Sequence, residues 1–346
     1  MEYVVLSGRD VNHFPAQGCI NEFEDVMVRT LGARLVCPQG GENLAILETL
    51  EGQPTVAFLV CLTVHQVPQF LAPVRDWRRR FHRVVVYVFD AYEKFSVPRW
   101  PRRRFSPGLK TINQVDRIYV ALAGAVEHYT AHFAAPVSFL PLAADVLQYG
   151  STREDRCISI NAYGRQHAGH SRLLAGHFND VGRDGLFYHT SHTAIGEVHD
   201  YLAHRRQFWK MLSMSRIALA YDPLVVNRPG VNAFPFSFVG QRWFESLAAG
   251  CLVVGRRPRC EEAATLLDWP DATVELPEDD AAVLPFMLDL LHDEERLRRA
   301  HRENYRQSLL RNDWRHRLAC ILEQDLGLEC PVALVQELKR LEQRAG

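Results

Sequence analysis

The sequence predicts an α/β protein made of two doubly wound parallel sheets in tandem. Its 346 residues exceed what one hydrophobic core usually holds, so two domains are expected. Short apolar runs alternate with helical stretches along the whole chain, which is the order of strands and helices in a parallel sheet. Several runs, such as Thr55 to Val64 and Arg83 to Phe89, are apolar at successive positions, and strands of that kind have helices on both faces.

The first domain is expected over residues 1–147. It opens with a short apolar strand, a polar loop and a helix, which together begin an α/β unit. The expected strands of this domain are Tyr3 to Ser7, Arg34 to Cys37, Thr55 to Val64, Arg83 to Phe89, and two more within residues 115–122 and 137–145. A helix with a basic end is expected between the third and fourth strands, over residues 67–83.

A polar, strand-free stretch at residues 147–157 suits a linker, and a second domain is expected over residues 156–322. Its strands are expected within residues 157–163, 185–190, 216–222, 251–254 and 272–277. The remaining residues, 323–346, are expected to form a helical segment that crosses back and packs on the domains, with Pro331 as a breaker. The whole is therefore expected to consist of two Rossmann-like domains that face each other across a cleft.

Composition limits the function classes. A formal net charge of −1 gives no electrostatic case for bulk nucleic-acid binding, and no apolar run approaches the roughly 20 residues of a membrane span. The first residues lack the basic start of a signal peptide, so a cytoplasmic location is expected. Eight cysteines without a C-x-x-C pair predict reduced thiols and no zinc site, and no other metal site or cofactor is expected.

The stretch from Gln241 to Gly255 reads as a helix that ends at Gly250 and leads into a buried strand. Within this helix Glu245 is a lone acid, and Arg242 lies three residues before it. A carboxylate can accept hydrogen bonds from two adjacent hydroxyl groups, as in a ribose. The alternative is that Glu245 forms a local salt bridge.

A second polar segment follows the first strand of the second domain. Gly164 allows a tight turn there, and Arg165 and Arg172 lie before and within the next helix. Backbone N–H groups at the start of a helix, together with guanidinium groups, form a phosphate site. The alternative is that both arginines are solvated surface residues.

These segments resemble the donor-binding half of GT-B glycosyltransferases of group 1 (family 4-like), and most closely their CgeB-like spore-maturation branch. The resemblance covers residues 155–320 and depends on SRIALAYDP, RWFESLAAGCLVVGRRP and ATVELPED. It implies that Glu245 holds the ribose of a nucleotide, that Arg165 and Arg172 bind the diphosphate, and that the loop from Tyr188 to His192 surrounds the base. The donor site expected from these observations comprises Gly164, Arg165, Arg172, Tyr188, His189, Thr190, Ser237, Gly240, Gln241, Arg242 and Glu245.

One position departs from the family. Retaining members often carry a second Glu eight residues before the ribose-binding one, and Ser237 occupies that position here. The expected function is metal-independent transfer of a sugar from a nucleotide-diphospho-sugar to an unidentified acceptor, which is a small molecule, a glycan or a lipid-linked compound. The alternatives are a non-catalytic GT-B-like nucleotide-binding or scaffold protein and a sugar-nucleotide epimerase.

A general base is expected from the first domain, where His13, His65 and Asp90 follow three strands. Such a group would take the proton of an acceptor hydroxyl in an inverting enzyme. The alternative for each is an ordinary polar loop residue.

Two basic runs, Arg78–Arg80 and Arg102–Arg104, alternate with aromatic residues. This composition is typical of contact with an anionic surface, such as a phosphorylated acceptor, a lipid headgroup or a nucleic acid. Contact with lipid headgroups would imply a peripheral membrane location. The alternative is a solvated helix face with a loop.

Overall fold

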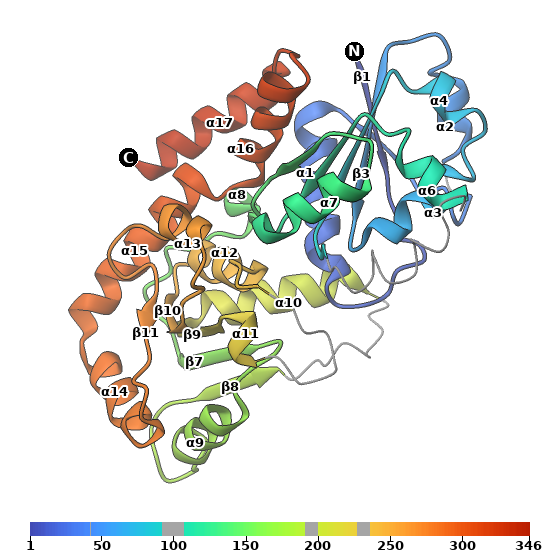
Figure 1. Ribbon diagram of the computed structural model, residues 1–346. Helices are drawn as coiled ribbons and strands as arrows, with labels where there is room; N and C mark the ends of the chain where they lie inside the picture. Colours follow the sequence, from blue (N-terminus) through green and yellow to red (C-terminus); the bar gives the residue numbers. More distant parts are fainter. Residues whose placement is uncertain (42, 92–106, 191–199, 227–235) are drawn as a thin grey trace. The chain divides into compact units, whose positions relative to one another are not determined.

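The computed structural model describes residues 1–41, 43–91, 107–190, 200–226 and 236–346 (Figure 1). The chain divides into two compact units. The first contains Met1–Leu142 and Arg315–Leu338, and the second contains Ala143–Trp314 and Lys339–Gly346. The stretch expected as a linker, residues 147–157, therefore belongs to the second unit. The chain returns to the first unit near its C-terminus, as expected.

The first unit contains a six-stranded sheet in the order β2-β1-β3-β4-β5-β6, in which neighbouring strands are parallel. The strands are β1 (Glu2–Leu6), β2 (Arg34–Val36), β3 (Thr55–Cys61), β4 (Arg83–Val88), β5 (Arg117–Val120) and β6 (Val137–Phe139). The strand order changes direction between β1 and β3. In open α/β sheets this switch point is where ligands bind, beyond the carboxyl ends of the strands.

The helices of the first unit lie mostly where the sequence predicts them. They are α1 (Gln17–Leu31), α2 (Ala45–Glu48), α3 (Val67–Leu71), α4 (Trp77–Arg80), α6 (Pro107–Ile112) and α7 (Val126–His132), with short turns η1 (Val64–Gln66) and η3 (Ala123–Ala125). The prediction of a single helix over residues 67–83 is wrong. The segment is divided into α3, which ends at Leu71 shortly before Pro73, and α4, which follows the left-handed backbone of Asp76 (φ 51°).

The second unit contains a five-stranded parallel sheet in the order β11-β10-β9-β7-β8. The strands are β7 (Ile158–Tyr163), β8 (Phe187–Thr190), β9 (Ser215–Tyr221), β10 (Leu252–Arg256) and β11 (Val274–Glu275). The helices are α8 (Val146–Tyr149), α9 (Ala168–Phe178), α10 (Tyr201–Ser213), α11 (Pro223–Val226), α12 (Gln241–Ala248), α13 (Glu261–Leu266), α14 (Asp280–His292) and α15 (Glu294–Arg311). Here the switch point lies between β7 and β9.

The core of the second unit follows from strand periodicity. Alternate residues of β7, β9 and β10 join α9 and α14 in one apolar cluster, while α10 and α12 pack on the opposite face of the sheet (Figure 1). The strand residues of this cluster are Ile160, Ala162, Ile217, Leu219, Tyr221, Leu252 and Val254. This confirms the expected doubly wound arrangement.

Toward the C-terminus the chain forms α16 (Trp314–Ala319), the π-helical turn η4 (Cys320–Asp325) and α17 (Val332–Ala345). Within the described parts of the chain, no helix combines the length and the apolar character needed to cross a membrane.

The end of α12 is held tightly. Gly250 has φ 74°, and a Cβ atom there would lie 2.8 Å from the carbonyl oxygen of Ser151, so only glycine fits without strain. The buried Arg156 donates from Nη2 to the carbonyl oxygen of Ala249 at 2.9 Å and from Nη1 to that of Ser215 at 2.8 Å. Because this contact satisfies a free helix carbonyl, it fixes the position of α12 and of the Glu245 side chain that α12 carries.

Candidate nucleotide site in the second unit

The switch point of the second unit brings together two of the expected site residues. Gly164 follows β7 with φ 66°. The guanidinium group of Arg242, from α12, lies directly against it, since a Cβ atom on Gly164 would be 2.8 Å from Nη2 of Arg242. Glycine therefore provides both the turn and the room for the arginine.

Arg242 is a half-buried positive charge. Burial lowers the pKa of its guanidinium group to about 10, an effect that Tyr163 partly opposes, so the group stays charged at neutral pH. Its Cζ atom lies 6.0 Å from the centre of the Tyr163 ring. Among the described residues no carboxylate forms an ion pair with Arg242. A charge in this position suits an anionic ligand.

Glu245 is buried, with 3% of its surface exposed. Nη2 of Arg205, from α10, donates to its Oε1 atom at 2.6 Å, and the hydroxyl group of Tyr163 donates to its Oε2 atom at 3.3 Å. The Tyr163 hydroxyl also lies 3.1 Å from the carbonyl oxygen of Arg242. Glu245 therefore takes part in a buried ion pair, which is the alternative considered for it, and this pair places its carboxylate beside the switch point.

Arg205 is absent from the residues expected from the sequence. The available signal was its position in α10, where Arg205, Trp209 and Leu212 follow the spacing of one helix face and are all buried. A charged residue on an apolar face needs a buried partner. The sequence does not readily distinguish Arg205 from its neighbour Arg206, although only Arg205 lies on the buried face.

The other basic residues of this edge are more exposed. Arg165 lies in the loop after β7, and Arg172 lies in the second turn of α9; both side chains are exposed. Gly240 has an extended backbone immediately before α12. Nε2 of Gln241 donates to the carbonyl oxygen of Ala143 at 2.8 Å, while its Oε1 atom is buried without a hydrogen-bond partner among the described residues.

Ser237 is engaged within the protein. Its hydroxyl group donates to the buried carboxylate of Asp222, which follows β9, and accepts from the backbone N–H of Arg259 at 2.8 Å. Asp222 also accepts from the backbone N–H of Leu224 at 2.9 Å. Ser237 thus ties together the segments that follow β9 and β10.

Tyr188, His189 and Thr190 are the last residues of β8, at the edge of the sheet. They were expected in a loop that continues to His192, but this part is strand, and residues 191 and 192 lie outside the described residues. Successive strand residues point to opposite faces, so the side chains of Tyr188 and His189 cannot both face one base from the same side of the sheet.

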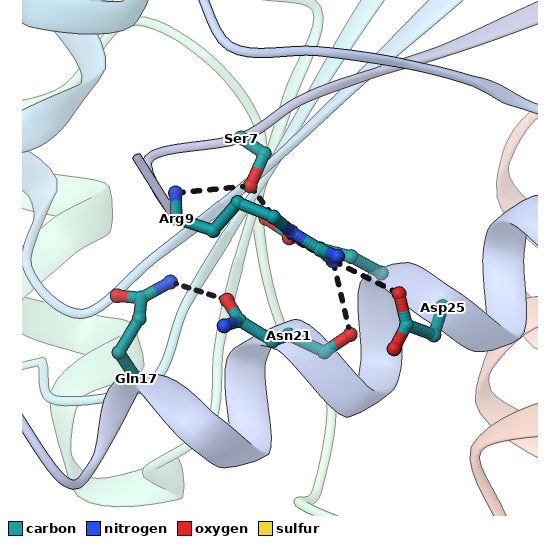
Figure 2. A network of polar contacts seen from close by, with 6 residues as sticks. Ser7, Arg9, Gln17, Asn21 and Asp25 are labelled. Atoms are coloured by element: carbon teal, nitrogen blue, oxygen red, sulfur yellow. Dashed lines mark hydrogen bonds and ion pairs between the residues drawn. The ribbon is translucent and has the colours of Figure 1, made fainter. Parts of the chain in front are cut away.

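The corresponding edge of the first unit holds a polar network, which Figure 2 shows. Ser7 follows β1, and its hydroxyl group donates to Oε2 of the fully buried Glu24 at 2.6 Å. Nη2 of Arg9 donates to the same oxygen at 2.8 Å and to Oδ1 of Asp25 at 3.0 Å. In addition, Nη2 of Arg9 donates to the carbonyl oxygen of Asn21 at 3.3 Å. Arg9 is therefore neutralised within the first unit.

The three candidate bases also lie at this edge. His13 is in the loop between β1 and α1, His65 is in η1 after β3, and Asp90 follows β4. Because β1, β3 and β4 are neighbours in a parallel sheet, these residues emerge at the carboxyl ends of three adjacent strands. All three are half-buried.

Two arginines of the first basic run form contacts within the first unit. Arg78 forms a two-point ion pair with Asp116, with both N–O distances at 3.0 Å, and Nη1 of Arg80 donates to the carbonyl oxygen of Leu47 at 2.8 Å. Arg102–Arg104 lie outside the described residues. Within the described ranges no group of three or more His, Cys, Asp or Glu side chains could hold a metal ion.

Comparison with known proteins identifies similar folds. Residues 196–323 match a family model described as "Glycosyl transferase-like", which covers less than half of the chain. The structure is similar to that of HepE from Anabaena in complex with UDP, with a TM-score of 0.54, 10% identity and coverage of 95% of this chain and 100% of that chain. The structure of HepE with UDP and glucose gives a TM-score of 0.54, 9% identity and the same coverage.

No curated protein sequence matches the chain significantly. The likeness to HepE concerns the fold, and it confirms the expected GT-B class of two parallel-sheet α/β units. The CgeB-like branch stays a prediction.

Proposed function

We propose that this protein is a glycosyltransferase that uses a nucleotide-diphospho-sugar as donor, acts without a metal ion and transfers the sugar to an acceptor hydroxyl group. The main support is Arg242, a half-buried cation at the switch point that has no carboxylate partner among the described residues. The match of residues 196–323 to a glycosyl transferase-like family agrees with this proposal, as does the fold shared with a protein that binds UDP.

The proposed donor lies along the edge of the second sheet. Its diphosphate contacts Arg242, with Arg165 and Arg172 nearby, and its ribose contacts Glu245. Fixed positive charge next to the leaving diphosphate stabilises the negative charge that develops as the glycosidic bond breaks. Gly164 contributes by letting the guanidinium group of Arg242 lie close to the backbone.

The first experiment is calorimetric titration of the protein with UDP, GDP, ADP and CDP. One of them is expected to bind, and Arg242→Gln is expected to weaken that binding. Arg298→Gln is the matched control, because Arg298 is exposed on α15 and its substitution changes net charge equally. Absence of binding by all four nucleotides, or equal weakening in both variants, contradicts the proposed site.

A non-catalytic nucleotide-binding protein is the second candidate, and the hydrogen bond between Ser237 and Asp222 favours it. This bond occupies the hydroxyl group at the position where related retaining enzymes carry a sugar-facing carboxylate. Slow hydrolysis of a UDP-, GDP-, ADP- or CDP-linked sugar separates the candidates. Nucleotide binding without hydrolysis or transfer of any sugar in the panel supports the second candidate.

For the acceptor side we propose that His13, His65 or Asp90 takes the hydroxyl proton. Each is replaced singly, as His13→Gln, His65→Gln and Asp90→Asn. The base is identified by a fall in the transfer rate with unchanged donor binding. If all three variants keep the wild-type rate, the base is elsewhere.

A further inference from the structure

The proposed site contains the buried ion pair between Arg205 and Glu245. Arg205 lies on α10, outside the segments from which the sequence predicts the donor site. We infer that Arg205 is a positioning residue for ribose recognition: it fixes the Glu245 carboxylate so that one free acceptor position on each oxygen faces the diol. This inference depends on the proposed nucleotide site and adds to it a residue of α10 that determines the preference for ribose.

Arg205 is held rigidly. It is 7% exposed, and its Cζ atom lies 4.4 Å from the centre of the Phe208 ring and 5.5 Å from that of Trp209. Trp209 in turn stacks on Tyr149, with ring centres 5.1 Å apart and planes inclined by 2°. A guanidinium group packed against aromatic rings loses little further freedom when it binds a carboxylate.

The hydrogen bonds at Glu245 use two of the acceptor positions of its carboxylate. A carboxylate offers about four acceptor positions, two on each oxygen. Arg205 occupies one position on Oε1 at 2.6 Å, and Tyr163 occupies one on Oε2 at 3.3 Å. One position therefore remains on each oxygen, and the two adjacent hydroxyl groups of a ribose are donors with matching spacing.

Loss of Arg205 would leave a carboxylate in a buried position without its counter-charge. Such a group turns toward other donors, since burial disfavours an isolated charge. The groups near it are Tyr163 from β7 and Arg242 from its own helix. A carboxylate that has turned no longer accepts from both ribose hydroxyl groups.

The experiment compares binding of a ribonucleotide and its 2′-deoxy form. The ratio of the dissociation constants of 2′-deoxy-UDP and UDP is measured for the wild type, Arg205→Gln and Arg206→Gln; a different base is used if the first titrations identify one. We expect a ratio of about ten or more in the wild type, because a hydrogen bond to a charged group is strong. Arg205→Gln is expected to reduce it to between one and two, with diphosphate contacts retained.

Arg206→Gln is the matched control. It removes the same charge from the next position of α10, where the side chain is exposed, and the ratio is expected to stay at the wild-type value. A general effect of charge or helix stability would change both variants alike, so equal ratios in the two variants overturn the inference.

The remaining outcomes are distinct. If the wild type binds no nucleoside diphosphate, the proposed function fails. If the wild type prefers UDP and Arg205→Gln keeps that preference, only the role of Arg205 is overturned. Should Arg205→Gln not fold, Arg205→Lys keeps the charge but lacks the planar group, and a ratio reduced at least twofold supports the inference while an unchanged ratio overturns it.

Discussion

The two switch points of the molecule use arginine in opposite ways. In the first unit Arg9 forms ion pairs with Glu24 and Asp25 (Figure 2). In the second unit Glu245 already has Arg205 as partner, so Arg242 is an additional positive charge. The first arrangement pairs the arginine within the fold, whereas the second holds an arginine that has no carboxylate partner among the described residues. Under the proposed function, the anion site therefore lies in the second unit.

Burial explains why the two arrangements differ in the free-energy cost of holding a charge. A paired buried charge is tolerated, but removing one partner leaves the other without compensation. Burial raises the pKa of the Glu24 carboxyl group, although Arg9 beside it acts in the opposite direction. Arg242 is only half-buried, so it remains charged without a carboxylate partner.

The largest expected effect is the loss of stability when Arg9 is replaced. Arg9→Gln leaves Glu24 fully buried without its cation and should lower the free energy of unfolding by roughly 3–4 kcal/mol. Urea denaturation followed by circular dichroism measures this change. Arg75→Gln serves as control, because Arg75 is 92% exposed, and it should have almost no effect. A loss below about 1 kcal/mol for Arg9→Gln would show that the network contributes little.

The second unit also contains a buried histidine whose titration should make stability depend on pH. Burial, followed by the charge of Arg156, lowers the pKa of His301 to about 4. Between the ordinary value of 6.5 and about 4 the unfolded chain binds more protons than the folded one, so stability falls as the pH falls. The loss over this range should be up to about 3 kcal/mol.

The test is urea denaturation at intervals from pH 7 to pH 4. His301→Gln should remove this part of the pH dependence, while His292→Gln, at an exposed position of α14, should keep it. Identical pH profiles for the wild type and His301→Gln would mean that another group causes the acid sensitivity.

Arg242→Gln should have the reverse effect of Arg9→Gln. Stability should change by less than about 0.5 kcal/mol, since no carboxylate loses its partner. The affinity for the nucleoside diphosphate should fall about 10- to 30-fold, which corresponds to about 1.4–2 kcal/mol, because a charge-assisted contact to phosphate is lost. Calorimetry and denaturation of the same preparation test both statements, and a large loss of stability would remove the contrast between the two arginines.

Much of the fold could be predicted from local signals. The apolar strands Arg83–Val88 and Ser215–Tyr221 and the turn at Gly250 lie close to the expected positions, because strand burial and left-handed glycine have strong local signatures. The break between α3 and α4 was missed, although Pro73 lies within it and proline is a strong helix breaker.

The site was less predictable, because its contacts join residues far apart in the chain. The pairing of Glu245 with Arg205 spans 40 positions, and that of Ser237 with Asp222 depends on how two strand ends meet. The pairing of Glu245 with Arg205 changes how the site should be tested. Glu245→Ala would remove the carboxylate that pairs with the buried Arg205 and destabilise the fold, so Glu245→Gln, which keeps the shape, is the better variant.

The smallest expected effect concerns Asp25, the second partner of Arg9. Its side chain is 44% exposed, in contrast to the fully buried Glu24. Asp25→Asn should therefore cost less than about 0.5 kcal/mol, because exposed ion pairs contribute little and Arg9 keeps its buried partner. Increasing the salt concentration to 1 M should reduce this small difference further. If Asp25→Asn cost as much as Arg9→Gln, the number of charges rather than their burial would determine the stability of the first switch point, and the comparison with Arg242 would lose its basis.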